Sequence, residues 1–205
     1  MYVLYGRPGS GNFVVEAALR LAGVEHRLET VPRGEPSADY LKISPLGQVP
    51  ALVLSDGEVV TESTAMCLLL AENHPEAGLG PLPGHPDRPQ FLRWMTFFSA
   101  MMYPTLLRYF YAQRLTMGGA DLEDLKEAAV RECDKGYAVL EAHLAGRDWM
   151  IGDRRSIADV YLLMLAYWHP LEGRPRDEWI NIRRVCAKLT PDPVLGDLNS
   201  VHELW

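Results

Sequence analysis

The segment Gly47–Ser63 has the sequence GQVPALVLSDGEVVTES and carries the most informative pattern in the first half of the chain. Two short apolar runs, 49–54 and 59–61, flank the residues Ser-Asp-Gly-Glu, which are typical of a turn between antiparallel strands. Ser63 belongs to the residue types that cap helices, and residues 63–73 show helical periodicity. The segment therefore predicts a β-hairpin that leads directly into a helix.

The residues before this hairpin alternate between strand-like and helix-like patterns. Residues 2–5 and 26–31 are β-rich runs, whereas residues 12–22 carry apolar side chains at helical spacing. Residues 37–43 fit either a short helix or an irregular segment. The predicted order for the first domain, residues 1–74, is therefore βαβαββα.

The second half of the chain has a different character. Residues 75–89 contain many prolines and glycines, which predicts a linker without regular structure. The strand pattern then disappears, and residues 90–205 are predicted to form an all-α domain. Its expected helices cover residues 91–115, 121–144, 156–168 and 179–189.

Composition excludes several classes of protein. The 205 residues are 48% hydrophobic and 23% charged, which is sufficient for one or two domains with a buried core. The net charge of −7 argues against a general nucleic-acid-binding protein, because such a protein needs a basic surface. No apolar run approaches the ~18 residues of a membrane span, and no signal-like leader is present. The three cysteines are widely spaced and the six histidines lack metal-site spacing, so we expect a cytoplasmic protein without a metal.

Four motifs follow one another along the chain: Tyr5 with Pro8–Asn12, Gln48–Leu52, Glu62–Ser63, and Gly152 with Ser156–Asp159. Each is weak alone, but the ordered set in a chain of this length resembles the cytosolic glutathione S-transferases. The resemblance implies an α/β thioredoxin-like domain followed by an all-α helical bundle. It also implies glutathione as co-substrate and a homodimeric protein.

Glutathione chemistry requires a thiolate, but a free thiol with a pKa of about 8.5 is mostly protonated at pH 7. Lowering that pKa by two units requires about 2.7 kcal/mol of preferential stabilisation of the anion. A helix N-terminus supplies N–H donors and partial positive charge, and Ser10 and Asn12 lie at a predicted helix start. Tyr5 occupies the position of the hydroxyl donor in several animal classes of the family. We predict Ser10 as the principal donor, with Tyr5 and Asn12 as alternatives; Ser10 or Asn12 could also serve only as a helix cap.

The resemblance assigns the other motifs to glutathione binding. Pro50 corresponds to the family's cis-proline, which implies that the backbone of Val49 pairs with the cysteinyl backbone of glutathione. Glu62 and Ser63 correspond to the residues that bind the γ-glutamyl ammonium and carboxylate, and Gln48 is expected near the same ligand. The residues alone also fit a strand-edge proline, a solvated charge and a helix cap.

The resemblance implies an enzyme: a glutathione transferase that joins glutathione to a small hydrophobic electrophile, as in detoxification. The alternatives on the same fold are a glutathione-dependent disulfide reductase, peroxidase or isomerase, and a non-catalytic binding protein. The polar residues Ser10–Asn12 and Glu62–Ser63 favour a working thiol site over binding alone. Ser156 and Asp159 are expected to start a buried helix through a capping box.

Overall fold

The computed structural model describes residues 1–116, 121–171 and 175–205. The chain divides into two compact units. Unit 1 comprises Met1–Arg88 together with Pro191–Leu204, and unit 2 comprises Pro89–Thr190 together with Trp205.

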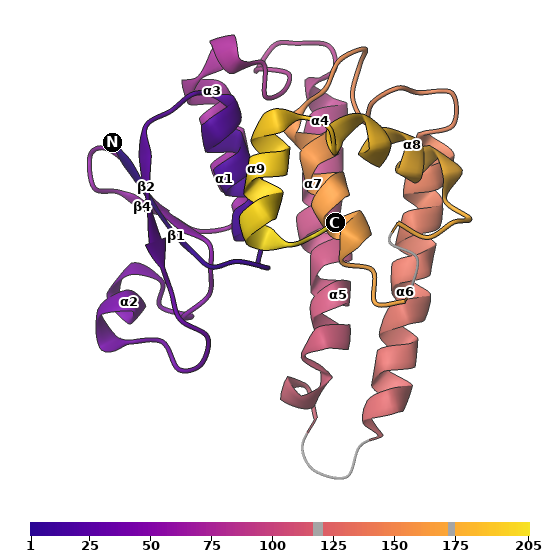
Figure 1. Ribbon diagram of the computed structural model, residues 1–205, viewed down its shortest axis with the longest axis horizontal. Coiled ribbons are helices and arrows are strands. Elements are labelled where there is room, and N and C mark those ends of the chain that lie inside the picture. Colours follow the sequence, from indigo (N-terminus) through magenta and orange to yellow (C-terminus); the bar gives the residue numbers. More distant parts are fainter. Residues whose placement is uncertain (117–120, 172–174) are drawn as a thin grey trace. The chain divides into compact units, whose positions relative to one another are not determined.

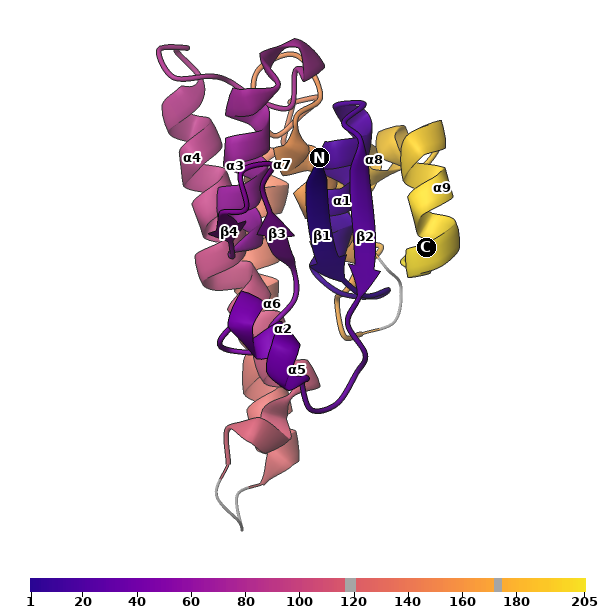
Figure 2. The same cartoon turned by 90° about the vertical axis from the view of Figure 1, so that its left-hand side faces the viewer.

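Unit 1 contains a four-stranded sheet in the order β2-β1-β3-β4. Strands β1 and β2 are parallel, and β3 is antiparallel to both β1 and β4. Helix α1 packs against α3, and Figure 2 shows the strands in front of these two helices. The bounds are β1 (Tyr2–Gly6), α1 (Asn12–Leu21), β2 (His26–Thr30), α2 (Ala38–Ile43), β3 (Ala51–Val53), β4 (Val59–Val60), α3 (Ser63–Asn73), a 3₁₀ turn (Pro75–Ala77) and α9 (Pro193–His202).

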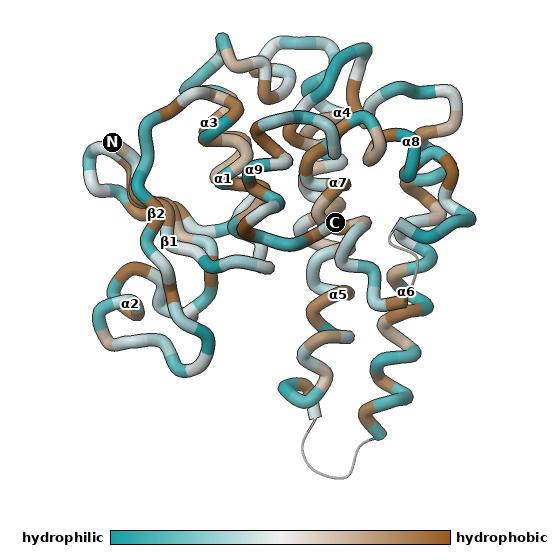
Figure 3. The backbone as a smooth tube through the Cα atoms, viewed as in Figure 1, coloured by the Kyte–Doolittle hydropathy of each residue, from teal (hydrophilic) through white to brown (hydrophobic). Residues whose placement is uncertain are grey.

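The predicted βαβαββα order is confirmed, and the apolar pattern of each element explains its place (Figure 1). Leu4 of β1 and Leu52 of β3 are fully buried and face each other in the ladder. The hydrophobic colouring at β1 in Figure 3 marks this part of the core. Helix α1 is buried from Asn12 to Leu19, so nearly every side chain in its first two turns lies in the interior.

Helix α9 was not among the helices predicted from the sequence. The Asp192 carboxylate caps it by accepting hydrogen bonds from the backbone N–H groups of Val194 and Leu195, at 2.9 and 3.2 Å. Leu195, Leu198 and His202 are buried and lie on one helical stripe. Because α9 packs against α1, Pro191–Leu204 groups with the first 88 residues rather than with the predicted second domain, 90–205.

Unit 2 contains only helices and turns among its described residues. The predicted helix 91–115 is interrupted in the structure: Tyr103 N–H bonds to Phe98 O, five residues back, in a π-helical turn. Proline has no N–H to continue the ladder, and Pro104 is the second residue after this turn. The bounds are α4 (Arg88–Phe97), the π turn (Phe98–Met102), α5 (Tyr103–Phe110), a 3₁₀ turn (Ala112–Arg114), α6 (Leu122–His143), α7 (Ile157–Tyr167) and α8 (Ile180–Leu189).

Helix α7 is the centre of the core of unit 2, because its residues from Ile157 to Ala166 are all buried. Its start is held by Asp159, whose carboxylate accepts hydrogen bonds from Met150 N, Ser156 N and Ser156 Oγ at 2.7, 2.8 and 3.0 Å. The predicted capping box is therefore present. Within the described ranges, no helix combines the length and the hydrophobicity that crossing a bilayer requires.

Candidate functional site

Three backbone segments meet at one edge of the sheet of unit 1. Strand β4 runs parallel to β1, because both are antiparallel to β3. The residues that follow β1 and β4, and the residues that precede β3, therefore emerge at the same edge. These are the turn Arg7–Asn12, the start of α3 at Glu62–Ser63, and the segment Gln48–Pro50. The topology thus brings together all the predicted site motifs of the first domain.

The turn after β1 is closed by Ser10. Its hydroxyl donates to the carbonyl of Arg7 at 2.7 Å and accepts from the backbone N–H of Asn12 at 3.3 Å. Gly9 has a φ of 63°, a left-handed conformation that glycine adopts without strain, and Gly11 stands at the cap position of α1. Ser10 is half-buried, so its hydroxyl lies at the mouth of α1 beside the solvent.

Asn12 has a different orientation from the one that a thiol donor needs. The residue is 1% exposed, and its Nδ2 donates to Glu16 Oε2 at 3.1 Å. Its Oδ1 lies against Gly6, because a Cβ built on Gly6 would come within 2.1 Å of that atom. The described contacts therefore direct the Asn12 side chain into the interior of unit 1.

Tyr5 follows Leu4 on β1, so its side chain leaves the opposite face of the sheet. Its ring lies 5.7 Å from the ring of Tyr40, centre to centre, in a cavity of about 450 Å³ between the sheet and α2. Three acidic residues, Glu29, Glu35 and Asp39, also line this cavity. This acidic lining was not anticipated from the sequence, because the three residues are separated along the chain.

The segment before β3 is held by hydrogen bonds to Gln48. Its carbonyl oxygen accepts from the hydroxyls of Tyr40 and Ser44, at 2.6 and 2.9 Å, while its side chain is exposed. The Val49–Pro50 peptide bond is cis, as the resemblance implies. Strand β3 begins at Ala51, which pairs with Tyr5, so Val49 lies just outside the described ladder.

Helix α3 begins with an unusual backbone conformation. Glu62 occupies the cap position with a φ of 67°, which a residue other than glycine rarely adopts, and its carbonyl accepts from Met66 N at 3.0 Å. Such conformations cost about 1–3 kcal/mol and cluster at functional sites. Ser63 is therefore the first residue of the helix rather than its cap, which differs from the expected N-cap position. It lies among the N–H groups of the first turn, which lack partners within the helix.

The protein's own thiols are unsuited to nucleophilic chemistry. Cys67, Cys133 and Cys186 are all buried and unlinked. Burial raises the pKa of all three thiols, that of Cys133 to about 12. A reactive thiolate at this site must therefore come from a ligand. In the described parts of the chain, no three His, Cys, Asp or Glu side chains gather as a metal site would require.

Sequence reasoning did not identify Glu16 or His202 as site residues. Both are buried, at 2% and 4% exposure, and His202 Nε2 lies 3.4 Å from Glu16 Oε2. The available signal was a charged residue, Glu16, among the otherwise apolar residues 13–19 of α1. Its partner could not be identified, because His202 is 186 residues away.

Comparison with known proteins gives consistent matches over most of the chain. Residues 14–73 match the family model "Glutathione S-transferase, N-terminal domain", and residues 92–186 match "Glutathione S-transferase, C-terminal domain". Glutathione S-transferase GST-4.5 of Xanthomonas campestris is 31% identical over 166 residues, which cover 80% of this chain and 81% of that protein. Maleylacetoacetate isomerase of Pseudomonas aeruginosa is 28% identical over 208 residues, covering 99% and 96%.

Solved structures show the same similarity. A sphingomonad glutathione S-transferase complexed with glutathione has a TM-score of 0.84 and 28% identity, covering 99% of this chain and 100% of that one. A glutathione transferase from Methylococcus capsulatus has a TM-score of 0.85 and 28% identity, covering 100% of both chains.

Proposed function

The chain belongs to the glutathione S-transferase family and is a glutathione transferase, and on that premise we propose that it joins the glutathione thiolate to a small hydrophobic electrophile. The observation that carries the proposal is the convergence of the Ser10 turn, the Val49–Pro50 bond and the start of α3 at one edge of the sheet. Each of the three segments offers hydrogen-bonding groups that suit a different part of glutathione.

We assign the γ-glutamyl end of glutathione to the start of α3. The N–H groups of the first turn and the Ser63 hydroxyl suit a carboxylate, because the helix dipole is positive there. The exposed Glu62 carboxylate suits the ammonium group. Val49 would pair with the cysteinyl backbone as an added strand does, and Gln48 would lie beside the ligand.

We assign the thiol to the mouth of α1. The Ser10 hydroxyl has a single proton, and in this structure it donates that proton in a hydrogen bond to the Arg7 carbonyl. To stabilise a thiolate it must rotate toward the sulfur, and the N-terminus of α1 then adds its partial positive charge. The thiolate would attack an electrophilic carbon, forming the C–S bond as the leaving group departs with the bonding electron pair. No protein thiol takes part.

A specific observation favours isomerase activity as a second candidate. The isomerase from Pseudomonas aeruginosa matches 99% of this chain, whereas the Xanthomonas transferase matches 80%. On the same site, the thiolate would add to a carbon–carbon double bond conjugated to a carbonyl group. Rotation about the resulting single bond and loss of the thiolate would then give the other isomer, with no net consumption of glutathione.

A substrate panel with glutathione distinguishes these activities. The panel contains an aryl halide, a cis-configured conjugated diketo acid, an organic hydroperoxide and a mixed disulfide. The proposal expects conjugation of the aryl halide with loss of one thiol per product. Isomerisation at constant thiol concentration would favour the second candidate, and glutathione binding without any turnover would favour a binding protein.

We also propose that the protein is a cytoplasmic homodimer. Two-fold symmetric dimers are the commonest assemblies of soluble proteins, and the family resemblance points the same way. Sedimentation equilibrium at micromolar concentration should therefore show twice the 23.0 kDa mass of one chain. A single 23.0 kDa species would contradict this proposal.

Ser63→Ala should weaken glutathione binding more than it destabilises the fold. Loss of a hydrogen bond to a charged ligand group costs about 1.5–3 kcal/mol, equivalent to a roughly 10- to 150-fold rise in Kd. Calorimetric titration with glutathione and thermal melting of the same samples measure the two effects. An unchanged Kd with a lowered Tm would show that Ser63 only supports the start of α3.

Ser10→Ala should raise the thiol pKa of bound glutathione and slow the thiolate step roughly 10- to 1000-fold. Tyr5→Phe should change the rate by less than about threefold, because the Tyr5 ring lies with Tyr40 in the cavity beside α2. The ultraviolet absorbance of the bound thiolate as a function of pH reports both variants. A shift with Tyr5→Phe but not with Ser10→Ala would reverse the assignment.

A further inference from the structure

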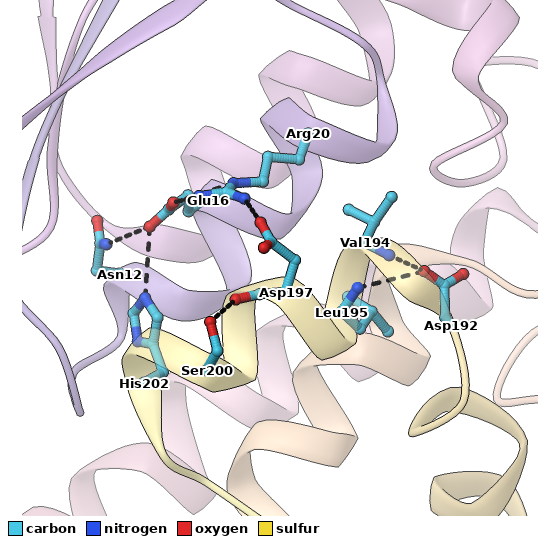
Figure 4. A network of polar contacts seen from close by, with 9 residues as sticks. All are labelled: Asn12, Glu16, Arg20, Asp192, Val194, Leu195, Asp197, Ser200 and His202. Carbon is cyan, nitrogen blue, oxygen red and sulfur yellow. Dashed lines mark hydrogen bonds and ion pairs between the residues drawn. The ribbon is translucent and has the colours of Figure 1, made fainter.

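A buried polar cluster joins the start of α1 to the C-terminal helix α9, both in unit 1 (Figure 4). Glu16 Oε2 accepts from Asn12 Nδ2 at 3.1 Å and lies 3.4 Å from His202 Nε2. Glu16 Oε1 accepts from Nε and Nη2 of Arg20 at 3.1 and 2.7 Å. Arg20 in turn pairs with Asp197 of α9. Glu16 is thus bonded both to residues of its own helix and to His202 of α9.

The hydrogen bonds determine the charge and orientation of the cluster. Burial by itself raises the pKa of the Glu16 carboxyl. Hydrogen bonds from His202 and Arg20 lower that pKa by more than burial raises it, so it lies below the ordinary 4.5. Glu16 is therefore ionised at neutral pH and accepts only. Asn12 must turn its Nδ2 toward Glu16, which leaves Asn12 Oδ1 against Gly6.

Asn12 is also bonded to the proposed thiol donor. Its backbone N–H donates to Ser10 Oγ at 3.3 Å, while its side chain donates to Glu16. Because the side chain and the backbone N–H share one Cα atom, a shift of the Asn12 backbone that broke the Glu16 bond would also move the N–H group that bonds to Ser10 Oγ. A continuous series of hydrogen bonds therefore runs from Ser10 through Asn12 and Glu16 to His202.

His202 adds a packing contact to this polar one. Its ring meets the ring of Phe13 edge to face, 5.3 Å apart between centres. Phe13 follows Asn12 and is fully buried, and Phe13 N–H bonds to Ser10 O at 3.1 Å. The C-terminal helix thus contacts Phe13 directly and reaches Asn12 through Glu16. Both Asn12 and Phe13 are hydrogen-bonded to Ser10.

We propose that Glu16 is a positioning residue for the thiol site. His202 of the C-terminal helix holds the Glu16 carboxylate in place, and Glu16 in turn holds Asn12, whose backbone N–H bonds to Ser10 Oγ and so fixes the turn. The proposal rests on the proposed function in one respect: the turn at Ser10 is taken as the place where the glutathione thiol is ionised. It assigns Asn12 a supporting role in place of direct contact with the sulfur. It also makes the thiol site dependent on the docking of residues 193–202.

The test compares three variants of α9 in the full-length protein. His202→Phe keeps an aromatic ring against Phe13 but removes the donor to Glu16. His202→Gln restores an N–H donor and serves as the conservative rescue. Asp197→Asn is the matched control, since it alters the exposed contact between the same two helices and leaves His202 and Glu16 unchanged.

Two readouts are taken: the thiol pKa of bound glutathione by ultraviolet absorbance, and the backbone amide chemical shifts of residues 10–13 without ligand. We expect His202→Phe to raise the thiol pKa by about one unit, which is a roughly tenfold loss of thiolate at pH values below both pKa values. We expect the same variant to shift the amide signals of Asn12 and Phe13. His202→Gln should recover most of both changes, and Asp197→Asn should leave both near the wild-type values.

The two readouts separate this proposal from the proposed function. Equal thiol pKa values and unchanged amide signals in wild type and His202→Phe would overturn the positioning role, as would an equal effect of Asp197→Asn. If the wild type does not lower the thiol pKa, the proposed function fails, and the amide signals still decide whether α9 holds the turn. If His202→Phe does not fold, Glu16→Gln is measured in its place. Glutamine has one carbonyl oxygen that accepts hydrogen bonds, whereas both oxygens of the Glu16 carboxylate accept them.

Discussion

Asp159→Ala is expected to lower the free energy of unfolding by about 3–4 kcal/mol, since it leaves three buried donors without their acceptor. These donors are Met150 N, Ser156 N and Ser156 Oγ. Asp159 itself is completely buried, so water cannot easily replace the carboxylate. The change would also release the loop Met150–Ser156 from the start of α7, the most buried helix of unit 2.

Urea unfolding at pH 7.5, followed by circular dichroism, measures this loss. The matched control is Asp153→Ala, an exposed residue of the same loop, which should change stability by less than about 0.5 kcal/mol. A loss below about 1 kcal/mol for Asp159→Ala would contradict the prediction, because it would mean that the donors find other partners.

The cost of Asp159→Ala should also depend on pH. Burial raises the pKa of the Asp159 carboxyl to about 6, although the hydrogen bonds from Met150 and Ser156 act in the opposite direction. A carboxyl with a raised pKa in the folded state binds its proton more tightly there than in the unfolded chain, where the value is 3.8. The part of its stabilising effect that depends on the bound proton is therefore full below pH 3.8 and is lost as the pH rises through about 6, whereas the hydrogen bonds remain. Asp159→Ala should therefore lower the free energy of unfolding by more at pH 5 than at pH 7.5. The opposite trend would show that the hydrogen bonds affect the pKa of Asp159 more than burial does.

Gly6→Ala is expected to destabilise the protein by about 3 kcal/mol and to disturb the thiol site at the same time. A Cβ at position 6 would lie 2.1 Å from Asn12 Oδ1 and 2.2 Å from Asn12 Cγ. Asn12 has little freedom to move away, because it is buried and bonded to Glu16. Either β1 or the first turn of α1 must therefore shift.

Thermal unfolding and the thiol titration of bound glutathione report the two consequences of Gly6→Ala. Gly196→Ala in α9 is the matched control: a Cβ there meets nothing within 4 Å, and alanine favours a helix, so stability should stay equal or rise by up to about 1 kcal/mol. Adding Asn12→Ala to Gly6→Ala removes the two nearest atoms but leaves a 2.8 Å contact with Asn12 Cβ, so the rescue should be partial. A Gly6→Ala protein with wild-type stability would show that the turn is not tightly held.

The local elements of unit 1 could be predicted from the sequence. Helix α3 has the predicted bounds, Ser63–Asn73, and the hairpin before it forms the pair β3–β4. Hydrophobic periodicity depends only on neighbours along the chain, so it predicts elements well. The roles of Pro50 and Glu62–Ser63 were instead expected from the resemblance to the family, because the residues alone also fit a strand-edge proline, a solvated charge and a helix cap.

The periodicity of residues 91–115 did not reveal the π turn at Phe98–Met102. Helical spacing continues on both sides of that turn, and a single extra residue changes the pattern too little to be recognised. Helix α9 was missed for a different reason: prolines stand just before it and at its first residue, Gly196 lies within it, and its apolar stripe is short. Its stability comes from packing on α1, a contact that local propensity does not contain.

Residue type and position in the sequence favoured Ser10 as the partner of a thiol, with Tyr5 and Asn12 as alternatives. Only the tertiary structure shows where the three side chains lie, with Ser10 at the mouth of α1, Tyr5 beside α2 and Asn12 in the interior. The physical reason is that a polar side chain turns toward its strongest available partner. For Asn12 that partner is the ionised Glu16, whose own environment is completed by His202, a residue 186 positions farther along the chain.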